Sequence, residues 1–145
     1  MRRVVLARLL LAFAILWLAL LVGSDALAQD PNATAAQKVA RDWLAVTDRG
    51  DAKASWNAAG KRFQAALPAA RWAAAFNRVR QPLGVVISRS MISTRFAKNL
   101  RGMPEGNYSL VVFRTSFANK TEAREVVTLE REPDGAWRVI GYVIS

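Results

Sequence analysis

The apolar residues of this chain change their spacing at Gly84, and this change limits the fold more than any other feature of the sequence. Before Gly84, apolar side chains recur every three or four residues, which is the spacing of amphipathic helices. After Gly84, β-branched residues alternate with polar ones, which is typical of strands with one buried face. Helices followed by strands, rather than alternating with them, predict an α+β domain in which helices pack on an antiparallel sheet.

Three helical segments are expected before Gly84. The first covers residues 36–50, where a glycine ends it. The second covers residues 51–67, begins at a capping aspartate and is interrupted at Gly60. The third covers residues 68–82 and is bounded by prolines. Each segment places one tryptophan on its apolar stripe, and we expect these residues in the core: Trp43, Trp56 and Trp72.

Four strands are expected after the helical segments. Their approximate ranges are 84–98, 107–118, 123–132 and 136–144. Residues 103–106 and 132–135 both place proline second and glycine fourth, the preference of type I turns. Because such turns join antiparallel neighbours, the sequence predicts a curved four-stranded antiparallel sheet against which the three helical segments pack.

The first 28 residues have the pattern of a secretory signal peptide. Three arginines precede an uninterrupted apolar run over residues 9–22, and a small-residue site ends at Ala28. We therefore expect cleavage between Ala28 and Gln29. The apolar run is shorter than the roughly 20 residues a helix needs to cross a bilayer, so no transmembrane anchor is expected after cleavage. These features predict a periplasmic or secreted bacterial protein that uses the general secretory route.

The remaining chain is the size of one ordinary domain. We expect residues 29–35 to form a flexible lead and residues 36–145 to form a single α+β domain. The sequence has no cysteine and no histidine. This composition excludes disulfides, Ser-His-Asp and Cys-His arrangements and the usual zinc and copper ligands. We therefore predict no catalytic residue, no metal and no cofactor.

The positive charge of the chain is concentrated in its middle. The sequence has 21 Lys and Arg against 11 Asp and Glu, of which three Arg and one Asp lie in residues 1–28, so a net charge of +8 remains after cleavage. No acidic residue lies in residues 52–104. Such a stretch forms either a solvated basic face or a surface for an anionic envelope component or small anion. Without a recognisable nucleic-acid-binding motif, no nucleic-acid partner is expected.

Strand parity places two charged residues on otherwise apolar faces. Arg89 shares a strand face with Val85 and Ile87, and Glu125 shares one with Val127. If both faces line the interior, burial of either charge alone is costly, so the two side chains are expected to pair. One alternative is a structural salt bridge. The other is a ligand site in which Arg89 holds an anion and Glu125 orients it, or acts as a carboxylate base.

Seven short segments carry a resemblance to a known family. They are residues 49–51, 55–56, 82–84, 88–89, 104–108, 115–120 and 137–142. Together they resemble the domain of unknown function 4019 family of bacterial proteins. The resemblance implies an envelope-located protein and a cystatin-like or nuclear-transport-factor-2-like shape, in which a sheet curls around helices and often leaves a cone-shaped pocket. It implies no catalytic residue, because the family has no established activity.

Three functions remain open from the sequence. The leading prediction is an exported, non-enzymatic binding or accessory module with a basic surface or pocket for an anionic partner. The second is an isomerase or lyase for a small molecule that uses Glu125 in a pocket. The third is a homodimeric interaction module. The strand over residues 107–118 is apolar on both faces around Leu110 and Val111, so one face can pack on the domain core and a second subunit can cover the other.

Overall fold

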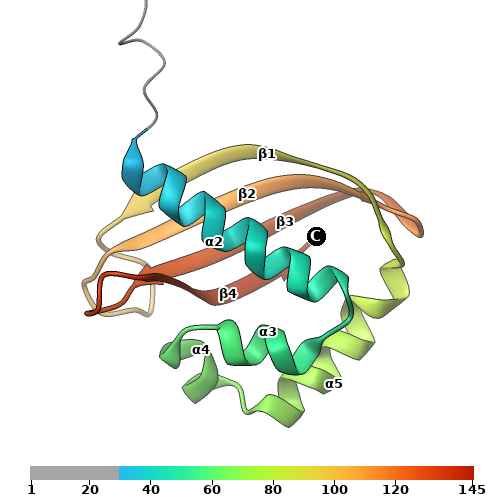
Figure 1. The fold of residues 1–145 in the computed structure, drawn as a ribbon, viewed down its shortest axis with the longest axis horizontal. Coiled ribbons are helices and arrows are strands. Elements are labelled where there is room, and N and C mark those ends of the chain that lie inside the picture. Colours follow the sequence, from blue (N-terminus) through green and yellow to red (C-terminus); the bar gives the residue numbers. More distant parts are fainter. Residues whose placement is uncertain (1–29) are drawn as a thin grey trace, which may run out of the picture. The chain divides into compact units, whose positions relative to one another are not determined.

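The computed structural model describes residues 30–145 (Figure 1). Within this range helices come first and a four-stranded antiparallel sheet follows, so the predicted α+β class is confirmed. The predicted signal peptide, residues 1–28, and its cleavage site at Ala28 and Gln29 lie outside the described residues. Among residues 30–145, every helix is too short or too polar to span a lipid bilayer.

The helical layer of the described chain consists of α2 (Pro31–Asp48), α3 (Ala52–Ala58), α4 (Lys61–Ala66), α5 (Ala69–Val79) and the 3-10 helix η2 (Gln81–Leu83). The predicted break at Gly60 is confirmed, since α3 and α4 lie on either side of it. The prediction of a flexible lead over residues 29–35 is wrong from Pro31 onward, because α2 begins there. Proline suits the first turn of a helix, where its missing amide has no intrahelical acceptor, and the alanines that follow favour helix.

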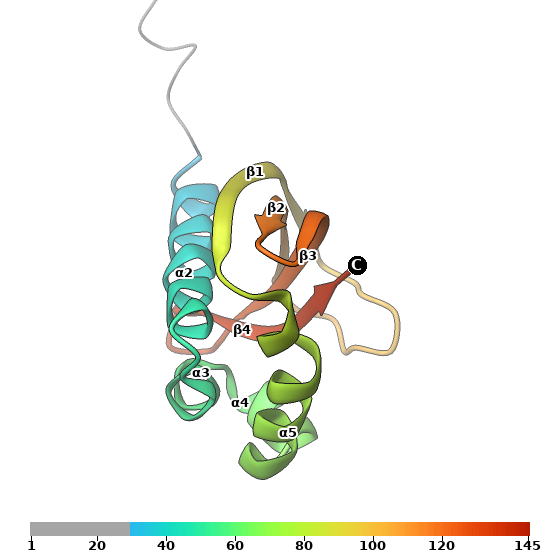
Figure 2. The same cartoon turned by 90° about the vertical axis from the view of Figure 1, so that its right-hand side faces the viewer.

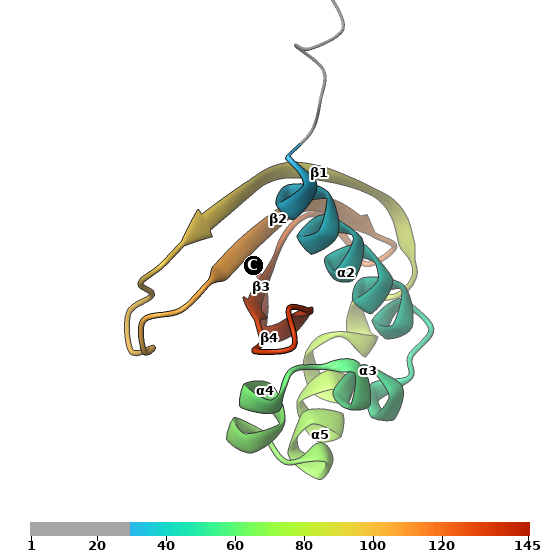
Figure 3. The ribbon, with the colours of Figure 1, turned by 60° about the vertical axis from the view of Figure 1, so that its left-hand side comes forward.

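The sheet consists of β1 (Val86–Ala97), β2 (Tyr108–Phe117), β3 (Lys120–Arg131) and β4 (Trp137–Ile144), each antiparallel to the next and paired in chain order. This is the predicted order, with β3 beginning three residues earlier than expected. Figure 3 shows β1 arching over α2. The sheet therefore has a concave side towards α2, here called the inner face, and a convex side away from it, called the outer face.

Two bulges interrupt β1. Val86 and Ser88 pair with consecutive residues of β2, so Ile87 is the extra residue of the first bulge, and Ile92 is the extra residue of the second. Each bulge shifts the alternation of side chains by one residue. Our prediction that Val85 and Ile87 line the interior with Arg89 is therefore wrong: their exposed fractions are 68% and 65%.

Gly60 lies where the helical layer closely approaches β4. Its backbone N–H donates to the carbonyl of Val139 in β4, with an N···O distance of 2.7 Å. A Cβ atom at this position would lie 2.9 Å from Glu132 Oε1 and 3.2 Å from the side chain of Ile140. The glycine that interrupts the second helical segment is thus also required for its close approach to β4.

Aromatic side chains occupy the space between the helices and the inner face. Those in direct ring contact are Trp43, Phe63, Trp72, Phe76 and Tyr142, with centroids 5.1 to 6.4 Å apart. The indole N–H groups of Trp43 and Trp72 both donate to oxygens of Ser55 at 2.8 Å, so their buried polar atoms are satisfied. The predicted core positions of these two tryptophans are confirmed, and Trp56 packs half-buried at the margin of the same core.

Candidate functional site

Glu125 lies on the inner face of β3 and is completely buried. Val127, its neighbour on that face, is buried as well, as strand parity predicted. Glu125 Oε1 accepts from Arg89 Nε at 2.8 Å and from the Thr115 hydroxyl, and Oε2 accepts from the Tyr142 hydroxyl. Donors from β1, β2 and β4 thus occupy both oxygens of a single carboxylate.

Arg89 connects this carboxylate to the helical layer. Its Nη1 and Nη2 donate to the two carboxylate oxygens of Asp48, at the end of α2, over 2.7 and 3.0 Å. Burial alone would lower the pKa of the guanidinium, but the hydrogen bonds to Asp48 and Glu125 outweigh burial and raise the pKa of Arg89. Burial and the charge of Glu125 raise the pKa of Tyr142, so its phenol stays protonated and remains a donor.

Arg80 completes the cluster from the end of α5. Its Nη2 donates to Asp48 at 3.1 Å and its Nη1 to the carbonyl of Gly84 at 2.8 Å. The guanidinium carbon lies 4.5 Å from the ring centroid of Phe117, a cation–π contact. Arg80 is 5% exposed, and its Nε has no hydrogen-bond partner within residues 30–145.

Asp48, Arg80, Arg89 and Glu125 together form what we call the inner ion network. It contains two positive and two negative groups, so it carries no excess charge to attract an anion. Every guanidinium nitrogen of Arg89 and both oxygens of Glu125 are bonded, and a ligand has to break one of these contacts to enter. The predicted pairing of Arg89 with Glu125 is confirmed, and its geometry supports a structural role. Their ligand-binding role stays a prediction.

The sequence interpretation missed Asp48 and Arg80. Asp48 lies in the first predicted helix, and no local pattern indicates that it turns towards β1. Arg80 is one of many basic residues in the stretch 52–104, and nothing in its local sequence distinguishes it from the others. An open depression of about 220 Å³ beside these two residues is lined by residues 47–50, 80–81 and 84–85 together with Phe76.

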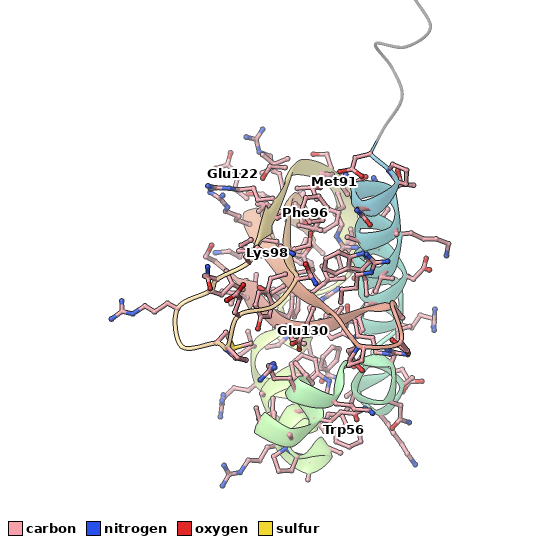
Figure 4. All side chains as sticks on the ribbon, turned by 90° about the vertical axis from the view of Figure 1, so that its left-hand side faces the viewer. Trp56, Met91, Phe96, Lys98, Glu122 and Glu130 are labelled. Atoms are coloured by element: carbon pink, nitrogen blue, oxygen red, sulfur yellow. The ribbon has the colours of Figure 1, made fainter. Side chains whose placement is uncertain are left out.

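The outer face of the sheet is organised in rows that cross the strands. Read from β1 towards β4, these rows are Arg95, Leu110, Thr128 and Gly141; Ser93, Val112, Val126 and Val143; and Ser90, Arg114 and Arg124. The loop between β1 and β2 extends from the sheet on the side away from α2 (Figure 2). Figure 4 shows Glu122 projecting on that same side, whereas Met91 lies towards α2.

Arg114 and Arg124 are direct register partners across β2 and β3. Both are exposed, and like charges directly opposite each other destabilise an antiparallel pair. Neither side chain forms a hydrogen bond or ion pair within residues 30–145, and the same holds for Arg95 and Glu122 on this face. Among the described residues, the outer face thus carries three unpaired arginines, Arg95, Arg114 and Arg124, and the unpaired carboxylate of Glu122.

The basic stretch of residues 52–104 does not form one surface. Arg80 and Arg89 belong to the inner ion network, and Arg62 forms two hydrogen bonds, of 3.0 and 2.9 Å, with Glu130. The remaining cations are distributed over α3, α4, α5, β1 and the loop that follows β1. Arg95 is the residue of this stretch that joins Arg114 and Arg124 on the outer face.

Within residues 30–145, no three carboxylates cluster closely enough to hold a metal ion. The search of curated proteins and the search of solved structures each found no match, so the cystatin-like or nuclear-transport-factor-2-like shape stays a prediction. Residues 39–142 match a family model described as "Protein of unknown function (DUF4019)". Because the match covers most of the chain, including all four strands up to Tyr142, the chain belongs to the DUF4019 family.

Proposed function

We propose that this protein is an exported, non-enzymatic module of the bacterial envelope that binds an anionic partner through the outer face of its sheet. The observation that carries the proposal is the pair Arg114 and Arg124, which face each other across two central strands and bond to no carboxylate in the part of the chain that the structure describes. An anion that lies between them relieves their repulsion and gains two charge-assisted hydrogen bonds.

The surroundings of this pair favour an anion as well. Ser90 is the register partner of Arg114, and Ser88 and Ser116 are partners in the next row. Serine hydroxyls donate hydrogen bonds to phosphate, sulfate or carboxylate oxygens, and the small side chains leave the two guanidinium groups accessible. Arg95 extends the positive charge to the other side of the face.

Export is the second part of the proposal, and it rests on the sequence of residues 1–28. Cell fractionation and N-terminal sequencing test it. We expect the protein in the periplasm or medium with Gln29 as its first residue, and Ala28→Glu should block processing because the cleavage site requires a small residue there. A cytoplasmic protein that begins with Met1 would contradict export.

Retention on an immobilised sulfated polyanion such as heparin tests the binding surface. The test variant is Arg114→Gln/Arg124→Gln, and the matched control is Arg71→Gln/Arg78→Gln, which removes the same charge from α5. Because both variants lose two charges, a difference between them reports the position of the charge. We expect the outer-face variant to elute at clearly lower salt than the control. Equal elution of both variants would overturn the outer face as the site.

A further inference from the structure

We propose that the anionic partner is a lipid surface, against which the protein lies with its outer face; this inference rests on the proposed function. Arginine contacts alone fit any polyanion. The outer face has a second property that a soluble polyanion does not use, namely an apolar band between the arginines.

The apolar band consists of one outer-face row and the bulge residue beside it. Val112, Val126 and Val143 are register partners on β2, β3 and β4, and Ile92 is the extra residue where β1 meets Val112. Val143 is 60% exposed and Ile92 is 49% exposed, whereas Val126 is half-buried and Val112 is buried. The two ends of the band thus present large apolar side chains to solvent, one at each edge of the sheet.

Arginines border this band on both sides. Arg95 lies in the row on one side, and Arg114 and Arg124 lie in the row on the other. Neighbouring rows on one face of a sheet are about 7 Å apart, so the arginines lie close beside the band. Because arginine side chains are long, all three guanidinium groups extend beyond the apolar side chains of the band. The charge complements an anionic lipid layer, in which head-group phosphates surround apolar chains.

The curvature of the sheet also suits a planar partner. β1 arches over α2 (Figure 3). The second bulge, at Ile92, lies near the middle of β1. A convex face can place the exposed side chains of its central row, Ile92 and Val143, against a flat surface while the flanking rows contact head groups. A second copy of this chain fits less well. A face-to-face dimer brings together three unpaired arginines of each copy, whereas Glu122 is the one unpaired carboxylate on this face within residues 30–145.

Vesicle co-sedimentation tests the inference. The protein is produced from the full sequence, its N-terminus is determined by mass spectrometry, and vesicles of phosphatidylcholine with about one third phosphatidylglycerol are compared with pure phosphatidylcholine. The test variant is Ile92→Ser/Val143→Ser. The matched control is Val79→Ser/Val85→Ser, which removes two exposed apolar residues outside the band.

We expect binding to the anionic vesicles and not to phosphatidylcholine alone. Ile92→Ser/Val143→Ser should weaken vesicle binding by about fivefold or more, and the control should not. Arg114→Gln/Arg124→Gln should weaken it about 25-fold, because each arginine near an anionic surface contributes roughly fivefold. Retention on heparin should change with the arginine variant and stay the same with the apolar variant.

The outcomes separate this inference from the proposed function. Retention on heparin without vesicle binding, or vesicle binding that Ile92→Ser/Val143→Ser leaves unchanged, would overturn the lipid surface and preserve the anion-binding face. A dimer in light scattering that this variant converts to a monomer would overturn it in favour of a second copy. If the protein binds neither heparin nor anionic vesicles, both proposals fail.

Discussion

On the inner face of the sheet, Arg89 donates hydrogen bonds from all three guanidinium nitrogens to carboxylates, whereas on the outer face Arg114 and Arg124 face each other and neither is bonded to a carboxylate of residues 30–145. The strands are the same, and only the direction of the side chain differs. Burial makes an unpaired charge costly, so the inner arginine is held by Asp48 and Glu125. Water tolerates an unpaired charge, so the outer arginines remain available to a partner. The side of the sheet on which an arginine lies therefore decides whether its charge is bonded within the protein or left accessible to solvent.

The largest expected effect is on the inner face. Glu125→Ala removes a buried carboxylate and leaves Arg89, Thr115 and Tyr142 without their shared acceptor. We expect the free energy of unfolding to fall by about 3–5 kcal/mol in urea denaturation. Glu122→Ala, on the outer face of the same strand, should change it by less than about 0.5 kcal/mol. Similar losses for both variants would remove the contrast between the faces.

A double-mutant cycle sharpens the same contrast. Arg89→Met and Glu125→Gln, singly and together, should show a coupling free energy of about 1–3 kcal/mol, because the two groups contact each other in a buried site. The corresponding cycle with Arg95→Met and Glu122→Gln on the outer face should give a value near zero. Coupling as large on the outer face as on the inner face would contradict this account.

On the outer face a charge reversal should stabilise the protein. Arg124→Glu converts a like-charge cross-strand pair with Arg114 into an opposite-charge pair. We expect the free energy of unfolding to rise by roughly 0.2–1 kcal/mol. The increase in Tm over the unmodified protein should be larger at low salt than at high salt, because salt screens the charges. The same variant should bind heparin less tightly. A lower stability at low salt would show that the two arginines do not repel each other in the folded protein.

The smallest effect concerns a paired charge at the surface. Arg138 and the backbone N–H of Ala136 lower the pKa of Asp134 to about 2 from the usual 3.8. Because the folded-state pKa is depressed, this contribution to stability is present above about pH 3.8 and is lost as the pH falls through about 2. As the pH falls from 5 to 2, the Tm of Asp134→Asn in thermal unfolding should fall slightly less than the Tm of the unmodified protein. Identical pH profiles would argue against the contact in solution.

The sequence predicted the elements of this fold better than their irregularities. Apolar spacing located the helices and strands, the glycine at position 60 indicated the break, and the two proline-glycine turns indicated the strand order, because all of these are local patterns. The bulges at Ile87 and Ile92 carry no such pattern, so the predicted interior position of Ile87 was wrong. The early start of α2 was missed because Pro31 was interpreted as part of a flexible lead.

The inner ion network and the arginine pair of the outer face could also be predicted only in part. Parity on β3 predicted the buried position of Glu125 and its pairing with Arg89. The partners Asp48 and Arg80 come from helix ends whose approach to the sheet no local pattern fixes. The pair Arg114 and Arg124 was missed because it depends on strand register, although both residues stand in predicted strands.

An NMR titration of the protein with inorganic tripolyphosphate tests most directly whether anions bind to the outer face rather than to the inner ion network. We predict saturable amide shifts confined to residues 88–95, 110–116 and 122–126, and unchanged signals from the side chains of Arg80 and Arg89. Shifts of the Arg80 or Arg89 side-chain signals, or amide shifts that concentrate at Asp48 and Arg80 or on α5, would contradict the assignment of binding to one face and stability to the other.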